Sequence, residues 1–481
     1  MGLANNFWDN IEQYRKLGFD PLKWVSSCSL EADPQLVRAA FAEVKRTTIK
    51  VAPSWFDAYA HIEGKEPELT RRVYDLASPA VDKEVEVKRA LALFRVHSAT
   101  AESQQALSEK LQGFFSAFKA KVSVANAPVA LTEHADAQFG LLDYIELRRG
   151  NKDGYMPALT SFTQVTDVTR EPDADVHVRV AMTGAIERLN LLGCGNPALF
   201  KFFPIYDAPA EEMLDRIRTN IDAFTARYNL VQEDYSSLKK GKLFYGTSAV
   251  AITNKELPTR YDQVEEGMEV MLTNRLGGLA AVSMHALTLM EPANAERFER
   301  AGVSTSAITA ARDEALKSLS EPHFALGKII AKYCPDFGAP YDRQAHVTAV
   351  YPVGARGVFA LGDLASLANC HLAVNELPVR HEEIARLATQ EGLVENATAS
   401  QHGCHLIVGT KDVLNLVAEE LRQHHFAPER VGFVAKKGVA SVAIENNAAD
   451  RYVAAKAKLA RLLAPPSPPS QPSSSAASPA S

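Results

Sequence analysis

Residues 198–228 read ALFKFFPIYDAPAEEMLDRIRTNIDAFTARY, and this stretch decides the fold. Its first part, up to Asp207, is typical of a short strand, and residues 210–228 follow it as a helix. The segments on either side continue the alternation: strands are predicted at 127–132, 141–147, 157–168 and 243–253, and a helix at 174–192. Strands that alternate with helices, separated by Gly and Pro, predict an α/β domain.

A second α/β segment begins near Tyr261. EEGMEVMLTNRLGG (265–278) reads as a strand that leads into a glycine turn and a helix. Helices are expected through 285–335. Further strands are predicted at 346–353, 370–379, 404–410, 430–436 and 439–446. The sequence therefore predicts two α/β domains in succession.

The composition is that of an ordinary globular protein. The chain has 481 residues, 46% of them hydrophobic and 23% charged, which suggests two or three domains. A net charge of -6 gives no reason to expect nucleic acid or an anionic membrane as a partner. Five cysteines do not suggest a disulfide framework. With neither a signal-peptide pattern nor an apolar run of roughly 18–20 residues, we expect a cytoplasmic protein.

The N-terminal segment 1–127 differs from the rest in its predicted secondary structure. Residues 1–32 look mixed and short-range, Asp33-Pro34 is typical of a helix start, and residues 67–124 have a helical pattern. That pattern predicts either an intramolecular helical layer or a module that binds a protein partner. Its apolar residues recur three and four positions apart, at Leu107, Leu111, Phe114, Phe115 and Phe118.

These differences in predicted secondary structure give the predicted domain boundaries. We expect an N-terminal segment at 1–127, α/β domains at 128–258 and 259–462, and a tail at 463–481. The tail is rich in Pro and Ser and is predicted to be disordered, because it has almost nothing to bury.

Five segments in order resemble the selenophosphate synthase (selenide, water dikinase) family of the aminoimidazole-ribonucleotide-synthase-like superfamily. They are LNLLGCGNPALFKFFPIYDAP (189–209), GMEVMLTNRLGG (267–278), ELPVRHEEIARLA (376–388), QHGCHLIV (401–408) and RVGFVAKKGVASVAIEN (430–446). The resemblance covers roughly residues 20–32 and 130–455. Residues 45–125 have no counterpart and are interpreted as a helical insertion.

The resemblance implies a two-domain fold, and a homodimer formed by first-domain strands that pair across a two-fold axis. A heterodimer with an intact paralogue stays open. The reaction it implies is an ATP-dependent phosphotransfer to hydrogen selenide. Such a site needs carboxylates that hold Mg²⁺ on the phosphate oxygens, together with glycine turns and a cation near the transferred group.

The implied metal site is only half kept. Asp136, in ADAQF, matches one of the two acids of the first motif, and Asp167 with Thr166 keeps the second. The third aspartate position holds Arg188, although Glu187 stands one position away, and the fourth holds Ala349. Because an arginine repels a metal ion, this set predicts weak Mg²⁺ binding at most, with Asp136 and Asp167 as the candidate ligands.

The phosphate-binding elements are altered as well. Glu-Asp-Tyr-Ser at 233–236 replaces the family's glycine turn, and Asn274 replaces its lysine, with Arg275 beside it. Thr166, Asp167 and Arg275 are therefore the candidate nucleotide- and phosphate-binding residues. Cys28 matches the family's fixed cysteine and is the candidate catalytic residue, although Ser26 occupies the reactive position.

A metal site of another kind is the alternative for Cys370-His371 and the His402–His405 segment. Cysteine and histidine are zinc ligands, and these residues fall on two predicted strands. Their spacing fits no standard zinc motif, so buried cysteines beside histidines at the rim are the favoured interpretation.

Three functions remain open. The favoured one is a divergent member with weak or no catalysis and a scaffold or regulatory role, because the metal aspartates, the glycine turn and the lysine are lost together. The second is an active ATP-dependent selenide, water dikinase with relocated ligands. The third is a superfamily enzyme with a different substrate.

Overall fold

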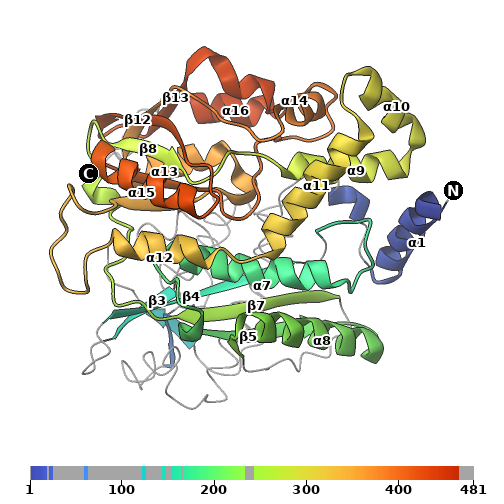
Figure 1. Cartoon of the computed structure of the whole chain (residues 1–481), viewed down its shortest axis with the longest axis horizontal. Helices are drawn as coiled ribbons and strands as arrows, with labels where there is room; N and C mark the ends of the chain where they lie inside the picture. The colour runs from blue at the N-terminus through green and yellow to red at the C-terminus, as the bar shows by residue number, and fades with distance from the viewer. Residues whose placement is uncertain are drawn as a thin grey trace, which may run out of the picture.

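The computed structural model describes residues 2–18, 21–24, 59–62, 122–125, 143–147, 154–163, 166–232 and 243–464. Two mixed sheets organise most of this part of the chain, and each forms the centre of one unit (Figure 1). The predicted α/β fold with two successive sheets is therefore confirmed.

The first unit contains a five-stranded sheet in the order β3-β4-β7-β5-β6. Its neighbours are antiparallel except for the parallel pair β5–β6. The strands are β3 (Asp143–Leu147), β4 (Gly154–Thr163), β5 (Phe200–Asp207), β6 (Val231–Gln232) and β7 (Phe244–Ala251).

Two helices cover this sheet, α7 (Asp175–Asn190) and α8 (Glu211–Tyr228). Helix α8 is amphipathic: it buries Ile217, Ile221 and Phe224, which recur at helical spacing, and ends at Asn229 in the left-handed conformation. Helix α7 is buried on nearly every side. It packs on the first sheet on one side and faces the second unit on the other (Figure 1).

The second unit contains a six-stranded sheet in the order β13-β10-β12-β8-β11-β9. Its neighbours are antiparallel except for the parallel pair β10–β13. The strands are β8 (Glu269–Leu272), β9 (Ala349–Pro352), β10 (Cys370–Val374), β11 (His405–Gly409), β12 (Glu429–Lys437) and β13 (Ser441–Ile444).

Eight helices accompany this sheet in the described part of the chain. They are α9 (Leu279–Met290), α10 (Pro292–Arg300), α11 (Thr305–Ser320), α12 (Phe324–Lys332), α13 (Phe359–Ala368), α14 (Glu382–Gln390), α15 (Lys411–Gln423) and α16 (Lys456–Leu463). Separate apolar clusters lie on the two faces of the sheet. Leu272 and Leu406 belong to one cluster, while Ile407 and Val350 belong to the other with residues of α12 and α15.

Two of the segments with a predicted structure differ from that prediction. Residues 2–16 form a helix, α1 (Gly2–Lys16), whose buried Phe7, Ile11 and Tyr14 are four and three positions apart. The segment expected to be helical through 124 contains a strand, β2 (Val122–Ala125), paired with β1 (Tyr59–Ile62). The alternating VSVA sequence suits an extended chain. The other residues of 67–124, the helix expected from Asp33 and the tail from 465 lie outside the described residues.

Helices α13–α16 were not anticipated, because only strands were expected after residue 335. Helix α13 is apolar almost throughout, so it lacks the polar face that reveals a helix in a sequence. Helix α15 did carry the signal, since Val413, Val417 and Leu421 are buried at four-residue spacing. The predicted domain boundaries at 127, 258 and 462 stay predictions.

The two units meet along α7 and α12, which lie side by side (Figure 1). A glycine pair allows this approach: Gly195, in the turn after α7, contacts Gly327 in α12. A Cβ on Gly327 would lie 2.6 Å from the Cα of Gly195 and 2.7 Å from the Cys194 carbonyl oxygen. No helix in the described part of the chain is long and apolar enough to cross a membrane.

Gly327→Ala should destabilise the protein by about 1–3 kcal/mol, because the added methyl group collides with backbone atoms. An alanine would otherwise favour the helix. The measurement is the free energy of unfolding from chemical denaturation. Gly409→Ala is the matched control, since its Cβ would meet no atom closer than 3.4 Å. Equal stability of the two variants would contradict the proposed collision.

Candidate functional site

Asp167 lies in the loop between β4 and α7 and is only 1% exposed. Its Oδ1 accepts hydrogen bonds from the Thr169 backbone N–H at 3.0 Å and from the Thr169 hydroxyl at 2.7 Å. Its Oδ2 accepts one from Nη2 of Arg312 at 2.7 Å. Arg312 belongs to α11 of the second unit and is 7% exposed. Both carboxylate oxygens are thus engaged by the protein itself.

The charges of this pair are fixed by their mutual contact. Burial raises the pKa of Asp167, but the Arg312 guanidinium and the Thr169 hydrogen bonds outweigh it, so that the pKa lies below its usual value. Arg312 also donates to the Thr169 hydroxyl oxygen at 3.1 Å, which closes a three-membered network. Asp167 is therefore ionised and is neutralised by an internal cation.

Helix α1 holds the same loop from outside. Asn10 donates its side-chain amide to the Thr169 carbonyl oxygen at 2.9 Å, and Phe7 and Ile11 belong to one apolar cluster with Val168. The backbone N–H of Thr166 donates to Nδ1 of His177 at 3.0 Å. The structure thus gives Thr166 a role in positioning the loop.

His177 links this loop to α1 as a neutral ring. Because its Nδ1 accepts from Thr166, its proton lies on Nε2, which donates to the Tyr14 hydroxyl oxygen at 2.9 Å. Complete burial lowers the pKa of His177 to about 4, although Asp167 opposes the shift. The ring therefore adds no positive charge near Asp167 at neutral pH.

A second buried carboxylate, Glu187, lies towards the other end of α7 and is 1% exposed. Its Oε1 accepts hydrogen bonds from the backbone N–H of His323 at 2.7 Å and from Nδ1 of the same residue at 2.9 Å. Its Oε2 accepts one from the Gly403 backbone N–H at 3.0 Å, and Nε2 of His405 lies 3.6 Å away. Glu187 therefore binds two loops of the second unit.

The Glu187–His323 contact is ionic whenever the His323 ring is protonated. Burial raises the pKa of Glu187, but His323 and, to a lesser extent, His405 and His402 outweigh it and hold the pKa well below its usual value. Burial likewise lowers the pKa of His323, and Glu187 reverses this, so that the pKa is raised. Glu187 is the neighbour of Arg188, which stands at an expected metal-ligand position. In the structure, Oε1 of Glu187 is bound by His323.

The remaining positions of the implied site have structural partners or lie apart. Ala349 is buried in β9, and Asn274 donates to the Gly403 carbonyl oxygen while its own oxygen accepts from Ala427 N–H. Arg275 is largely exposed and forms an ion pair with Glu429 at 3.1 Å. This places Arg275 in a surface ion pair rather than beside Asp167.

Three predicted features lie outside the described residues: Cys28, Asp136 and the 233–236 segment. Their predicted roles stay predictions.

The described donors do not fit a metal ion. Among the residues that the structure describes, no three His, Cys, Asp or Glu side chains form a group that could hold a metal. Asp167 offers its oxygens to Thr169 and Arg312, whereas Mg²⁺ needs oxygen ligands free to face it. The alternative zinc site is equally unsupported, since the Cys404 thiol donates to the Asn274 carbonyl oxygen at 3.2 Å.

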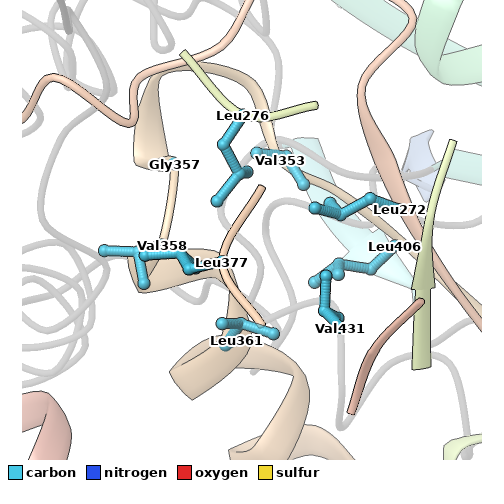
Figure 2. A pocket seen from close by; sticks show the side chains of 9 residues that line it. All are labelled: Leu272, Leu276, Val353, Gly357, Val358, Leu361, Leu377, Leu406 and Val431. Atoms are coloured by element: carbon cyan, nitrogen blue, oxygen red, sulfur yellow. The ribbon is translucent and has the colours of Figure 1, made fainter. Parts of the chain in front are cut away.

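A small cavity in the second unit does not provide a catalytic site either. Side chains from β8, β11, β12 and α13 point into it, and Figure 2 shows how they surround it. The lining is entirely apolar apart from one glycine: Leu272, Leu276, Val353, Gly357, Val358, Leu361, Leu377, Leu406 and Val431. A cavity without polar or titratable groups is a packing gap in the core.

Sequence reasoning missed Arg312 and His323, the two residues that neutralise the buried acids. Arg312 lies on α11, 145 positions from Asp167, and His323 lies 136 positions from Glu187. Nothing local distinguishes them from other charged residues of a helix and a loop, so no motif could have revealed them.

Arg312→Met should cost about 3–5 kcal/mol of unfolding free energy, because it leaves a buried carboxylate without its counter-ion. Adding Asp167→Asn removes that charge, so the double variant should be more stable than the single one. Arg170→Met is the control, since Arg170 is exposed and lies 3.9 Å from Asp167, and should cost less than about 1 kcal/mol. A single variant as stable as wild type would contradict a buried ion pair.

The same pair predicts a pH dependence. A carboxylate with a lowered folded-state pKa contributes stability above its unfolded pKa of about 3.9, and this stability is lost as the pH falls through the folded value. Between pH about 7 and pH about 2, wild type should lose more unfolding free energy than the Arg312→Met/Asp167→Asn variant. Parallel pH curves for the two proteins would show that Asp167 is not stabilised as a charged group.

No protein-family model and no curated protein matches the sequence. Similar solved structures include thiamine-monophosphate kinase from Stenotrophomonas maltophilia K279a, at 14% identity over 63% of this chain and 92% of that chain, with a TM-score of 0.43. HypE of E. coli matches at 14% over 63% and 84%, with a TM-score of 0.40. The protein tt0281 of Thermus thermophilus matches at 16% over 63% and 88%, with a TM-score of 0.45.

The low identities and TM-scores describe a distant likeness in the path of the chain.

Proposed function

We propose that this chain is a divergent member of the aminoimidazole-ribonucleotide-synthase-like superfamily that performs weak or no phosphotransfer and acts as a scaffold or regulatory subunit. The observation that carries the proposal is the buried ion pair between Asp167 and Arg312, at 2.7 Å. A guanidinium occupies Oδ2 of the one described aspartate that the resemblance assigns to Mg²⁺.

Charge supports this proposal. MgATP binding depends on carboxylates whose charge the ion neutralises. Here Arg312 already neutralises Asp167, and Arg188 replaces a further carboxylate of the implied set. An approaching Mg²⁺ would have to break the buried contact of Arg312 with Asp167, which costs several kcal/mol, and would leave Asp313 as the remaining acid bound to Arg312.

The structure of a HypE was determined in complex with ATP, and that of AaThiL with AMPPCP and TMP. Nucleotide binding is therefore the property to test in this chain. Asp136 and the 233–236 segment belong to the same proposal: we infer that they add too little to restore a polyphosphate site.

Isothermal titration of MgATP into the full chain tests the proposal. We expect no Mg²⁺-dependent binding at millimolar ATP, because the carboxylate that should hold the ion is occupied by Arg312. Micromolar binding that requires Mg²⁺ and is abolished by Asp167→Asn would overturn it and favour an active phosphotransferase. Thermal unfolding of Asp167→Asn is the control for a folded variant, and Asp450→Asn, at an exposed ion pair with Lys456, is the matched charge change.

The scaffold role is tested by affinity purification with and without residues 45–125. If that segment recruits a partner, its deletion should remove specific proteins from the purified set. Sedimentation of the full chain at the same time tests the homodimer that the resemblance implies. An unchanged set of partners would count against the scaffold role, whatever the outcome of the ATP titration.

A further inference from the structure

The side chain of Glu187 connects the two units at one point. Helix α7, which carries it, packs on the first sheet. All the groups that bind it belong to the second unit: the backbone and ring of His323, just before α12, and the backbone of Gly403, just before β11. A change at this carboxylate therefore acts directly on the contact between the units.

Five titratable groups gather here. Helix α7 contributes Glu187, the segment after α11 contributes Glu321 and His323, and the segment at the start of β11 contributes His402 and His405. Of these, His323 is both in contact with the carboxylate and open to water. Its side chain is 25% exposed, so its ring exchanges protons with the solvent without any unfolding.

We propose that Glu187 and His323 form a proton-operated latch between the two units, closed while the His323 ring is charged and loosened when it is neutral. The charged ring stabilises a carboxylate that is otherwise surrounded by protein. After loss of the proton, the buried carboxylate no longer has the charged donor that is hydrogen-bonded to it, and the loss of such a counter-ion is strongly destabilising.

The neighbouring histidine cannot replace His323 in this role. Burial lowers the pKa of His402 to about 4, with Glu187 opposing the shift, so this ring is neutral at physiological pH. His405 is a second ring near the carboxylate, with its Nε2 3.6 Å from Oε2 of Glu187, but its side chain is only 5% exposed. His323 is therefore the ring that combines a hydrogen bond to Glu187 with access to water.

The sign of the pH effect follows from the raised pKa of His323. Its contribution to stability is fully present below the unfolded pKa of about 6.5 and is lost as the pH rises through the higher folded value. The contact between the units should therefore loosen on the alkaline side of neutrality. His402 acts in the opposite direction, because its lowered pKa reduces stability as the pH falls from about 6.5 towards 4.

Two measurements on the full wild-type chain test the latch. A titration of the histidine ring carbons by NMR should give His323 a midpoint above about 6.5. Over the same pH range, the amides of His323 and Gly403, which donate to Glu187, should exchange with solvent several-fold faster after correction for intrinsic exchange. A midpoint at or below 6.5, or corrected exchange that does not change with pH, would overturn the proposal.

Glu187→Gln keeps a carbonyl acceptor but removes the charge, so it should lower the His323 midpoint and abolish the pH dependence of amide exchange. The matched control is the exposed pair of His381 and Glu314, whose Nε2 and Oε2 atoms lie 3.0 Å apart. His381→Asn suits the left-handed backbone there and should leave both readouts unchanged. An equal effect of the two variants would refute the latch, and the wild-type titration decides the matter if Glu187→Gln does not fold.

Discussion

Two carboxylates that lie almost out of contact with water must be neutralised, and this requirement organises the junction between the two units. Asp167 precedes α7 and Glu187 lies near its end, and each obtains its counter-ion from the second unit. Arg312 comes from α11 and His323 from the segment that follows it. One helix and its continuation thus supply both cations. Helix α7, which otherwise packs on the first sheet, is tied to the second unit at two points by the same physical need.

The two ion pairs differ in what a change of solvent can do to them. Arginine keeps its charge at any ordinary pH, so the Asp167 contact responds only to protonation of the acid. Histidine changes charge near neutral pH, so the Glu187 contact depends on the protonation of His323. Helix α1 adds to the permanence of the first contact, because Asn10 and Tyr14 hold the loop that carries Asp167. Near neutral pH, the ion pair before α7 thus keeps its charges, whereas the contact near the end of α7 changes with the protonation of His323.

The sequence revealed the α/β architecture because short strands and amphipathic helices have different periods, as in the succession of β5 and α8. It failed at α13, whose nearly uniform apolar character follows from burial on several sides, and at α1, where the spacing of Phe7, Ile11 and Tyr14 was present but overlooked. At the site, the resemblance named Asp167 as a candidate ligand of Mg²⁺ and nucleotide, which stays a prediction, and the structure shows Asp167 as a buried acid paired with Arg312. Arg312, which neutralises Asp167, lies 145 positions along the chain. The pair could therefore be recognised only once the position of α11 was known.

The arginine beside Asp167 also constrains how the chain can vary. Replacing Arg312 alone would leave a buried acid without its counter-ion and would lower stability. A loss of stability of that size reduces the amount of folded protein in a cell. A substitution at position 312 is therefore tolerated best together with one at position 167, so the two positions are expected to change as a pair.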